Sequence, residues 1–169
     1  MRTMAILPLV TLCLAPTKTF AAPAYLLNKT ITVSVTTTAS FVANGRQTTG
    51  RRNTTFTIYI STQGRIFSRR VRQVGSASET GEAATPTGVN MRFEGEKLVG
   101  VAQYVSGAGR MVVSFDSIGQ SCTANFLYGR DNGRPMSWKG LDGVTRTATS
   151  PWVASNVTCS IAAGNAFAG

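Results

Sequence analysis

ITVSVTTTASFVA, residues 31–43, alternates between two kinds of side chain along its whole length. Apolar or small residues, with one threonine among them, hold every second position: Ile31, Val33, Val35, Thr37, Ala39, Phe41 and Ala43. Threonine and serine hold most of the positions between them. Successive side chains of a strand point to opposite faces of its sheet, so this period of two predicts one long strand with one face towards a core.

The segment that follows predicts a hairpin with this strand. Asn44-Gly45 is a turn signal, and beyond a polar run Phe56, Ile58 and Ile60 alternate with less apolar residues. A third strand is expected over 65–72 after the turn at 62–64, and it is strongly basic.

Further strands are expected along the rest of the chain. The stretches 89–93, 98–105 and 111–115 are separated by glycine-containing turns and predict an antiparallel meander. Two more strands are expected around Cys122 and Cys159, and a short one within 136–150. Residues 73–88 have no periodic apolar set and predict a long mobile loop.

Composition agrees with an all-β domain. The chain has 169 residues, of which 43% are hydrophobic and 14% charged, and this length suits one domain. No internal repeat is present. We expect a single antiparallel β-sandwich or an up-and-down barrel of about 7 to 9 strands, and the pattern does not choose between these two.

The first residues have the pattern of a secretory signal. Arg2 precedes an apolar stretch over 5–14, and Ala22-Pro23-Ala24 is a small-residue cleavage pattern. We expect cleavage after Ala24, so that 1–24 is the signal peptide and 25–169 the β domain. No later segment approaches the ~20 apolar residues of a transmembrane helix. The predicted compartment is the periplasm or the exterior.

The cysteines support the same compartment. Removing the leader removes Cys13 and leaves Cys122 and Cys159. Each shares its strand face with apolar neighbours, and two cysteines in a small exported domain favour a pair. We therefore predict a disulfide in or beside the core.

Several segments resemble a family. The run TIYISTQGRIF at 57–67, GRMVV at 109–113, Ser121-Cys122 and Thr158-Cys159-Ser160 are similar to a loose group of small exported β-rich proteins of alpha-proteobacteria. The resemblance implies export in a Gram-negative bacterium and a β-rich domain. It implies no activity.

The residue inventory argues against an enzyme. The chain contains no histidine, which excludes mechanisms that need an imidazole base or metal ligand. No metal or cofactor motif is found, so we expect no metal and no cofactor. A histidine-free hydrolase acting through Asp116 or Asp131 is a remote alternative that requires a second carboxylate nearby. For Asp116 the ordinary interpretation is that it caps the turn at 117–119.

Arginines are the strongest functional signal in this chain of net charge +10. The candidates for anion binding are Arg46, Arg51, Arg52, Arg65, Arg69, Arg70 and Arg72. On a strand Arg65 and Arg69 share one face, and Arg70 and Arg72 the other. Guanidinium groups suit phosphates and carboxylates, so the candidate partners are lipopolysaccharide, acidic polysaccharide or nucleic acid. The competing interpretation is that these charges keep an edge strand from aggregating.

Two tryptophans suggest a different function. We expect Trp138 and Trp152 to be partly exposed and name them as possible ligand contacts, because an aromatic side chain can line a small-molecule site. The leading hypothesis is a non-enzymatic exported envelope module that binds anionic surface polymers through its arginines. A β-barrel or sandwich that binds a small molecule is the alternative.

Overall fold

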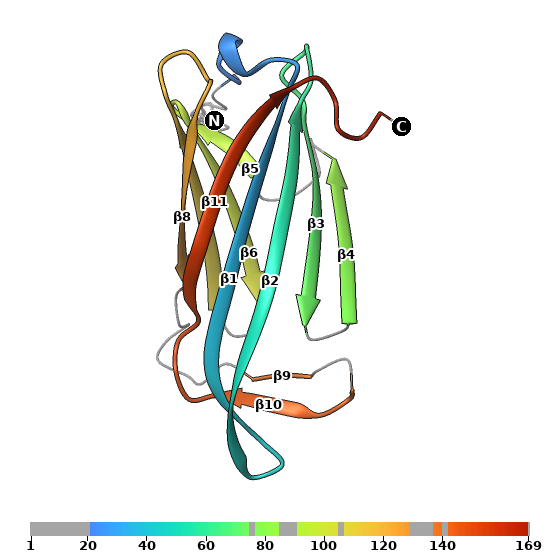
Figure 1. The fold of residues 1–169 in the computed structure, drawn as a ribbon, viewed down its shortest axis with the longest axis vertical. Coiled ribbons are helices and arrows are strands. Elements are labelled where there is room, and N and C mark those ends of the chain that lie inside the picture. The colour runs from blue at the N-terminus through green and yellow to red at the C-terminus, as the bar shows by residue number, and fades with distance from the viewer. Residues whose placement is uncertain are drawn as a thin grey trace, which may run out of the picture.

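Strands make up nearly all of the regular structure (Figure 1). The computed structural model describes residues 21–74, 77–84, 91–104, 107–128, 137–139 and 142–168. One short 3-10 helix, η1 (Ala24–Leu26), precedes the first strand. The strands are β1 (Lys29–Ala43), β2 (Arg46–Ile60), β3 (Ile66–Val74), β4 (Ala77–Ala84), β5 (Met91–Glu94), β6 (Lys97–Tyr104), β7 (Gly107–Phe115), β8 (Cys122–Tyr128), β9 (Ser137–Lys139), β10 (Thr145–Ala148) and β11 (Val153–Ala163).

The first sheet is built around the predicted hairpin. β1 and β2 pair antiparallel over all 15 residues of each strand, and Asn44 and Gly45 both have the positive φ that a tight hairpin turn requires. The strand order is β4-β3-β2-β1-β10-β9, and β11 also pairs with β1. The long hairpin expected from the alternating sequence is confirmed.

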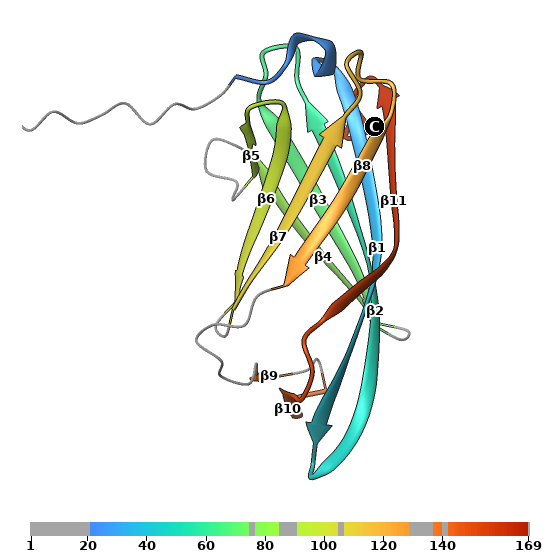
Figure 2. The same cartoon turned by 90° about the vertical axis from the view of Figure 1, so that its left-hand side faces the viewer.

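The second sheet is the predicted meander. β5, β6, β7 and β8 pair in that order, each antiparallel to the next. Figure 2 shows this sheet facing the upper part of the first one, whereas β1 and β2 extend beyond it towards β9 and β10. The described chain is therefore all-β with two antiparallel sheets, which confirms the fold class that the alternating sequence predicts.

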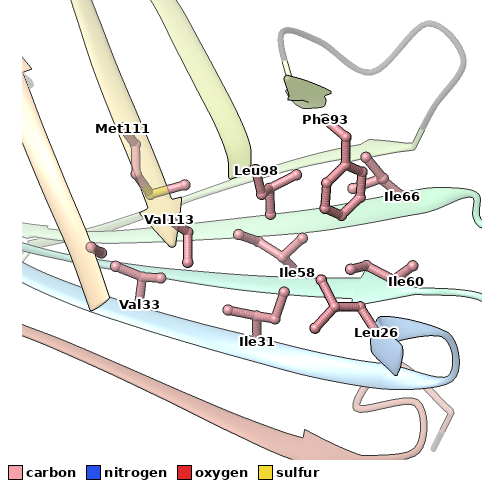
Figure 3. Close-up of a cluster of buried hydrophobic side chains, with 11 residues drawn as sticks. Leu26, Ile31, Val33, Ile58, Ile60, Ile66, Phe93, Leu98, Met111 and Val113 are labelled. Atoms are coloured by element: carbon pink, nitrogen blue, oxygen red, sulfur yellow. The ribbon is translucent and has the colours of Figure 1, made fainter. Parts of the chain in front are cut away.

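The main core lies between the two sheets. Ile31, Val33 and Ile58 of the first sheet and Leu98 and Val113 of the second have no exposed surface, and Figure 3 shows these side chains pointing towards one another. Removing such side chains from water is the main favourable contribution to folding, at about 1.5–3 kcal/mol for each of them. The inward positions of β1 are those that the alternation in 31–43 predicted.

A disulfide joins the edges of the two sheets. Cys122 in β8 and Cys159 in β11 are bonded, with their Cα atoms 5.5 Å apart. Both residues pack against the main core. The predicted pairing and its place beside the core are confirmed.

The segment predicted to be a mobile loop, 73–88, instead contains strand β4. β4 pairs with β3 in a register that sets Glu82 opposite Arg69 and Glu79 opposite Arg72. Opposite charges across a strand pair are favourable, and this non-local pairing is absent from the local sequence pattern. Residues 75–76 and 85–88 of that segment lie outside the described residues, as does the predicted leader up to residue 20.

Two further expectations concern local elements. The segment 136–150, predicted to hold one short strand, holds the two short strands β9 and β10, which pair with each other. No helix in the described part of the chain has the length and apolar character that a bilayer crossing requires.

Replacing both Cys122 and Cys159 by serine is expected to lower the free energy of unfolding by about 4 kcal/mol. The bond spans 37 residues, and a closed loop of that length restricts the unfolded chain by this amount in the chain-entropy model. Urea unfolding of the oxidised protein and the double variant measures the difference. An unchanged midpoint would show that the bond adds nothing to the packing of β8 against β11.

Candidate anion-binding site

Strand register decides which arginines lie on the same face of the first sheet as the main core. Directly paired residues carry their side chains on the same face. Phe56 is paired with Val33, a core residue of β1, and with Arg70 of β3. Thr54 is paired with Arg72, and Thr37 of β1 with Arg52 of β2. Arg52, Arg70 and Arg72 therefore share the core-carrying face, and we call them the inner-face arginine cluster.

Arg52 is held by two neighbours. Its Nε donates a hydrogen bond of 2.9 Å to Oγ1 of Thr37, and its Cζ lies 3.8 Å from the centre of the Trp152 ring. Thr37 is only 1% exposed and Trp152 only 9%. A guanidinium stacked on an indole gains cation–π energy, and the two contacts together hold the guanidinium of Arg52 in place.

Arg70 and Arg72 are neighbours on the same face of β3. They stand two residues apart, which on a strand is roughly 7 Å, and both side chains are half-buried. Arg72 is also the diagonal neighbour of Arg52, because Arg52 lies two residues before the Thr54 that Arg72 pairs with. Glu79 of β4 is the register partner of Arg72. The three arginines thus form one contiguous group across β2 and β3.

The other predicted arginines lie elsewhere. Arg69 is on the opposite face of β3, with its Cζ 5.0 Å from the centre of the Phe167 ring. Arg46, Arg51 and Arg65 are exposed: the first two lie in β2 and the third in the turn before β3. The seven candidates therefore do not share one face, and the separation of Arg69 from Arg70 and Arg72 is the one that the strand period predicts.

Trp152 is buried, although the sequence analysis predicts that it is partly exposed. It is buried beneath Arg52 because the chain before it is tied to β1. The amides of Thr149 and Ser150 both donate to the carbonyl oxygen of Ser40, and the hydroxyl of Ser150 accepts from the amide of Ser40. These long-range bonds have no local sequence signal. Trp138 is in β9, and its side chain lies outside the described residues.

Asp116 has the structural function that its position in the sequence suggested. Its carboxylate accepts hydrogen bonds from the amides of Gln120 and Ser121 and from the Ser121 hydroxyl. Desolvation alone would raise the pKa of Asp116, but these hydrogen bonds outweigh it and lower the pKa below its usual range. The carboxylate therefore holds its own turn together. Asp131 lies outside the described residues.

A metal centre finds no support in the part of the chain that the structure describes. Within it, no group of three or more histidine, cysteine, aspartate or glutamate residues is placed to hold a metal ion. The inner-face arginine cluster is cationic, and guanidinium groups bind anions rather than metals.

Comparisons with known proteins give no further assignment. No protein-family model matches the chain, and no curated protein or solved structure is similar to it.

Replacing Asp116 by asparagine is expected to reduce the loss of stability in acid. A carboxylate whose pKa is lowered by folding contributes stability that is fully present above its unfolded value of ~3.9 and disappears as the pH falls through the folded value. Urea midpoints measured from about pH 5 to pH 2 should fall less steeply for Asp116→Asn than for the wild type. Parallel profiles would contradict the assigned hydrogen bonds.

Trp152→Ala is expected to destabilise the fold by about 3–5 kcal/mol, the usual range for removing a buried tryptophan. Urea unfolding measures the change, and Val153→Ala is the neighbouring control. Val153 is 57% exposed, so its truncation should change stability by no more than about 0.5 kcal/mol. A stable Trp152→Ala variant would instead favour an exposed tryptophan that is available to a ligand.

Proposed function

We propose that this chain is an exported, non-enzymatic β-sandwich module that binds anionic polymers of the bacterial envelope. The binding groups are the inner-face arginine cluster, and the candidate polymers are lipopolysaccharide with its phosphates and acidic polysaccharide. The observation that carries this proposal is that Arg52, Arg70 and Arg72 share the core-carrying face of the first sheet.

Two findings support a sandwich in an oxidising compartment. The described strands form two separately paired sheets, with the main core between them. β8 and β11 are joined by the Cys122–Cys159 bond, and disulfides persist mainly in exported proteins. A small domain that crosses to the periplasm or the exterior would use such a bond for stability.

Electrostatics supports an anionic partner for this cluster. Arg52, Arg70 and Arg72 are half-buried on one face of the first sheet, and guanidinium groups bind anions. A planar guanidinium can donate two parallel hydrogen bonds to a carboxylate or a phosphate, which makes arginine well suited to recognising such anions.

The alternative, that the arginines only protect a sheet edge and keep the domain soluble, fits a different subset. Arg46, Arg51 and Arg65 are exposed, as such charges should be. Arg52, by contrast, lies on the core-carrying face and stacks on a buried tryptophan. A charge that serves solubility alone would not be placed there.

Replacing Arg70 and Arg72 together by glutamine is expected to abolish retention of the protein on a heparin matrix at low salt. The matched control is Arg46→Gln with Arg51→Gln, which removes the same net charge from exposed positions. The wild type and the control should elute at similar salt concentrations, because counterion screening weakens the same contacts in both. Circular dichroism verifies that both variants fold.

Two results would contradict the proposal. Equal elution of the two double variants would show that retention depends on total charge alone. Retention of the wild type that is insensitive to salt would exclude an electrostatic contact through arginines.

A further inference from the structure

We infer that the mature chain begins at Ala22, three residues before the start that the pattern Ala22-Pro23-Ala24 suggests. A signal peptidase hydrolyses the peptide bond between Ala21 and Ala22. Water adds its hydroxyl group to the carbonyl carbon of Ala21 and its hydrogen to the nitrogen of Ala22, so the leader departs with a new carboxylate. This inference rests on the proposed function, because it requires export, and it adds the site of processing.

Two bonds near the end of the leader meet the sequence requirement of a signal peptidase. Such an enzyme needs small residues at the first and third positions before the bond. Ala24 and Ala22 hold these positions for the later bond. Ala21 and Thr19 hold them for the earlier bond. The residue pattern therefore allows either product, and the packing of the chain favours one of them.

The edge of the folded domain lies between Ala21 and Ala22. Ala21 is exposed, whereas Ala22 is half-buried and packs against the main core. The side chain of Ala22 also lies near the turn before β3, because a Cβ atom at Gly64 would be 3.6 Å from the Cβ atom of Ala22. A cut after Ala24 would remove these contacts, and a cut after Ala21 keeps them.

The helix η1 depends on carbonyl groups that a cut after Ala24 would remove. The amide of Leu26 donates a hydrogen bond of 3.0 Å to the carbonyl oxygen of Pro23. The amide of Leu27 donates one of 3.2 Å to the carbonyl oxygen of Ala24. Leu26 has no exposed surface, and a buried amide that loses its acceptor destabilises the fold. The chain that begins at Ala22 retains both acceptors.

The side chains that η1 positions pack at one end of the main core (Figure 3). Leu26 belongs to this core, and Tyr25 packs against it. Both approach the turn after β7 closely, because a Cβ atom at Gly119 would lie 2.6 Å from Cδ2 of Tyr25 and 3.1 Å from Cδ2 of Leu26. Residues 22–24 therefore hold in place a segment that packs against the rest of the domain.

The test is to express the full chain in a Gram-negative bacterium and to determine the first residue of the exported protein. The protein is purified from the periplasm and from the medium. Intact-mass spectrometry and N-terminal sequencing then identify its start. We expect Ala22-Pro23-Ala24-Tyr25 as the first four residues.

Two matched variants place a large side chain directly before each candidate bond. Ala21 and Ala24 are both exposed, so the fold should accept leucine at either position. Ala21→Leu should abolish the start at Ala22, because the peptidase needs a small residue before the bond. Ala24→Leu should leave the wild-type start unchanged. Thermal unfolding verifies that each exported variant is folded.

The outcomes separate this inference from the proposed function. A wild-type protein that begins at Tyr25, or a start at Ala22 that survives Ala21→Leu, would overturn the inference and leave export in place. A protein that still begins at Met1 would overturn both the inference and the export that the proposed function includes. Heparin retention that does not depend on Arg70 and Arg72 would overturn the proposed binding alone.

Discussion

The uninterrupted pairing of β1 with β2 is the constraint on which the rest of the structure depends. All 15 residues of each strand are paired in one register. A slip of one residue would turn every core side chain of a strand to the opposite face. The register sets Ile31 against Ile58 and Val33 against Phe56, so both strands present apolar groups to the second sheet. β3 and β11 then add to the two sides of this hairpin.

The same register places charge on the face that carries the core. Once Phe56 faces inwards, its partner Arg70 on β3 must share that face, and Arg72 follows two residues later. Arg52 of β2 lies on this face as well, where its guanidinium stacks on Trp152. The first sheet thus carries both the apolar residues that stabilise the fold and a group of arginines on the same face.

Much of this architecture follows from local sequence, and the remainder depends on contacts between distant segments. The period of two in 31–43 predicts β1 and its buried face, and the cysteine pair predicts the bond between β8 and β11. The sequence does not predict β4, because residues 77–84 have no alternating apolar pattern. The strand shows only in its pairing with β3, where Glu79 and Glu82 lie opposite arginines. The alternation of side chains along a strand predicts that Arg69 and Arg70 lie on opposite faces of the sheet. Which of them lies on the face that carries the core follows only from the pairing of Phe56 with Arg70.

Arginine-specific labelling with and without a bound polymer shows which arginines contact the polymer. The protein is treated with a dicarbonyl reagent in the presence and absence of heparin, and mass spectrometry measures the labelled fraction at each arginine. If the inner-face arginine cluster binds the polymer, heparin should protect Arg52, Arg70 and Arg72. Arg46 and Arg51, which are exposed, should keep their labelling. Protection confined to Arg46, Arg51 and Arg65, with the inner-face arginine cluster labelled equally in both conditions, would contradict it.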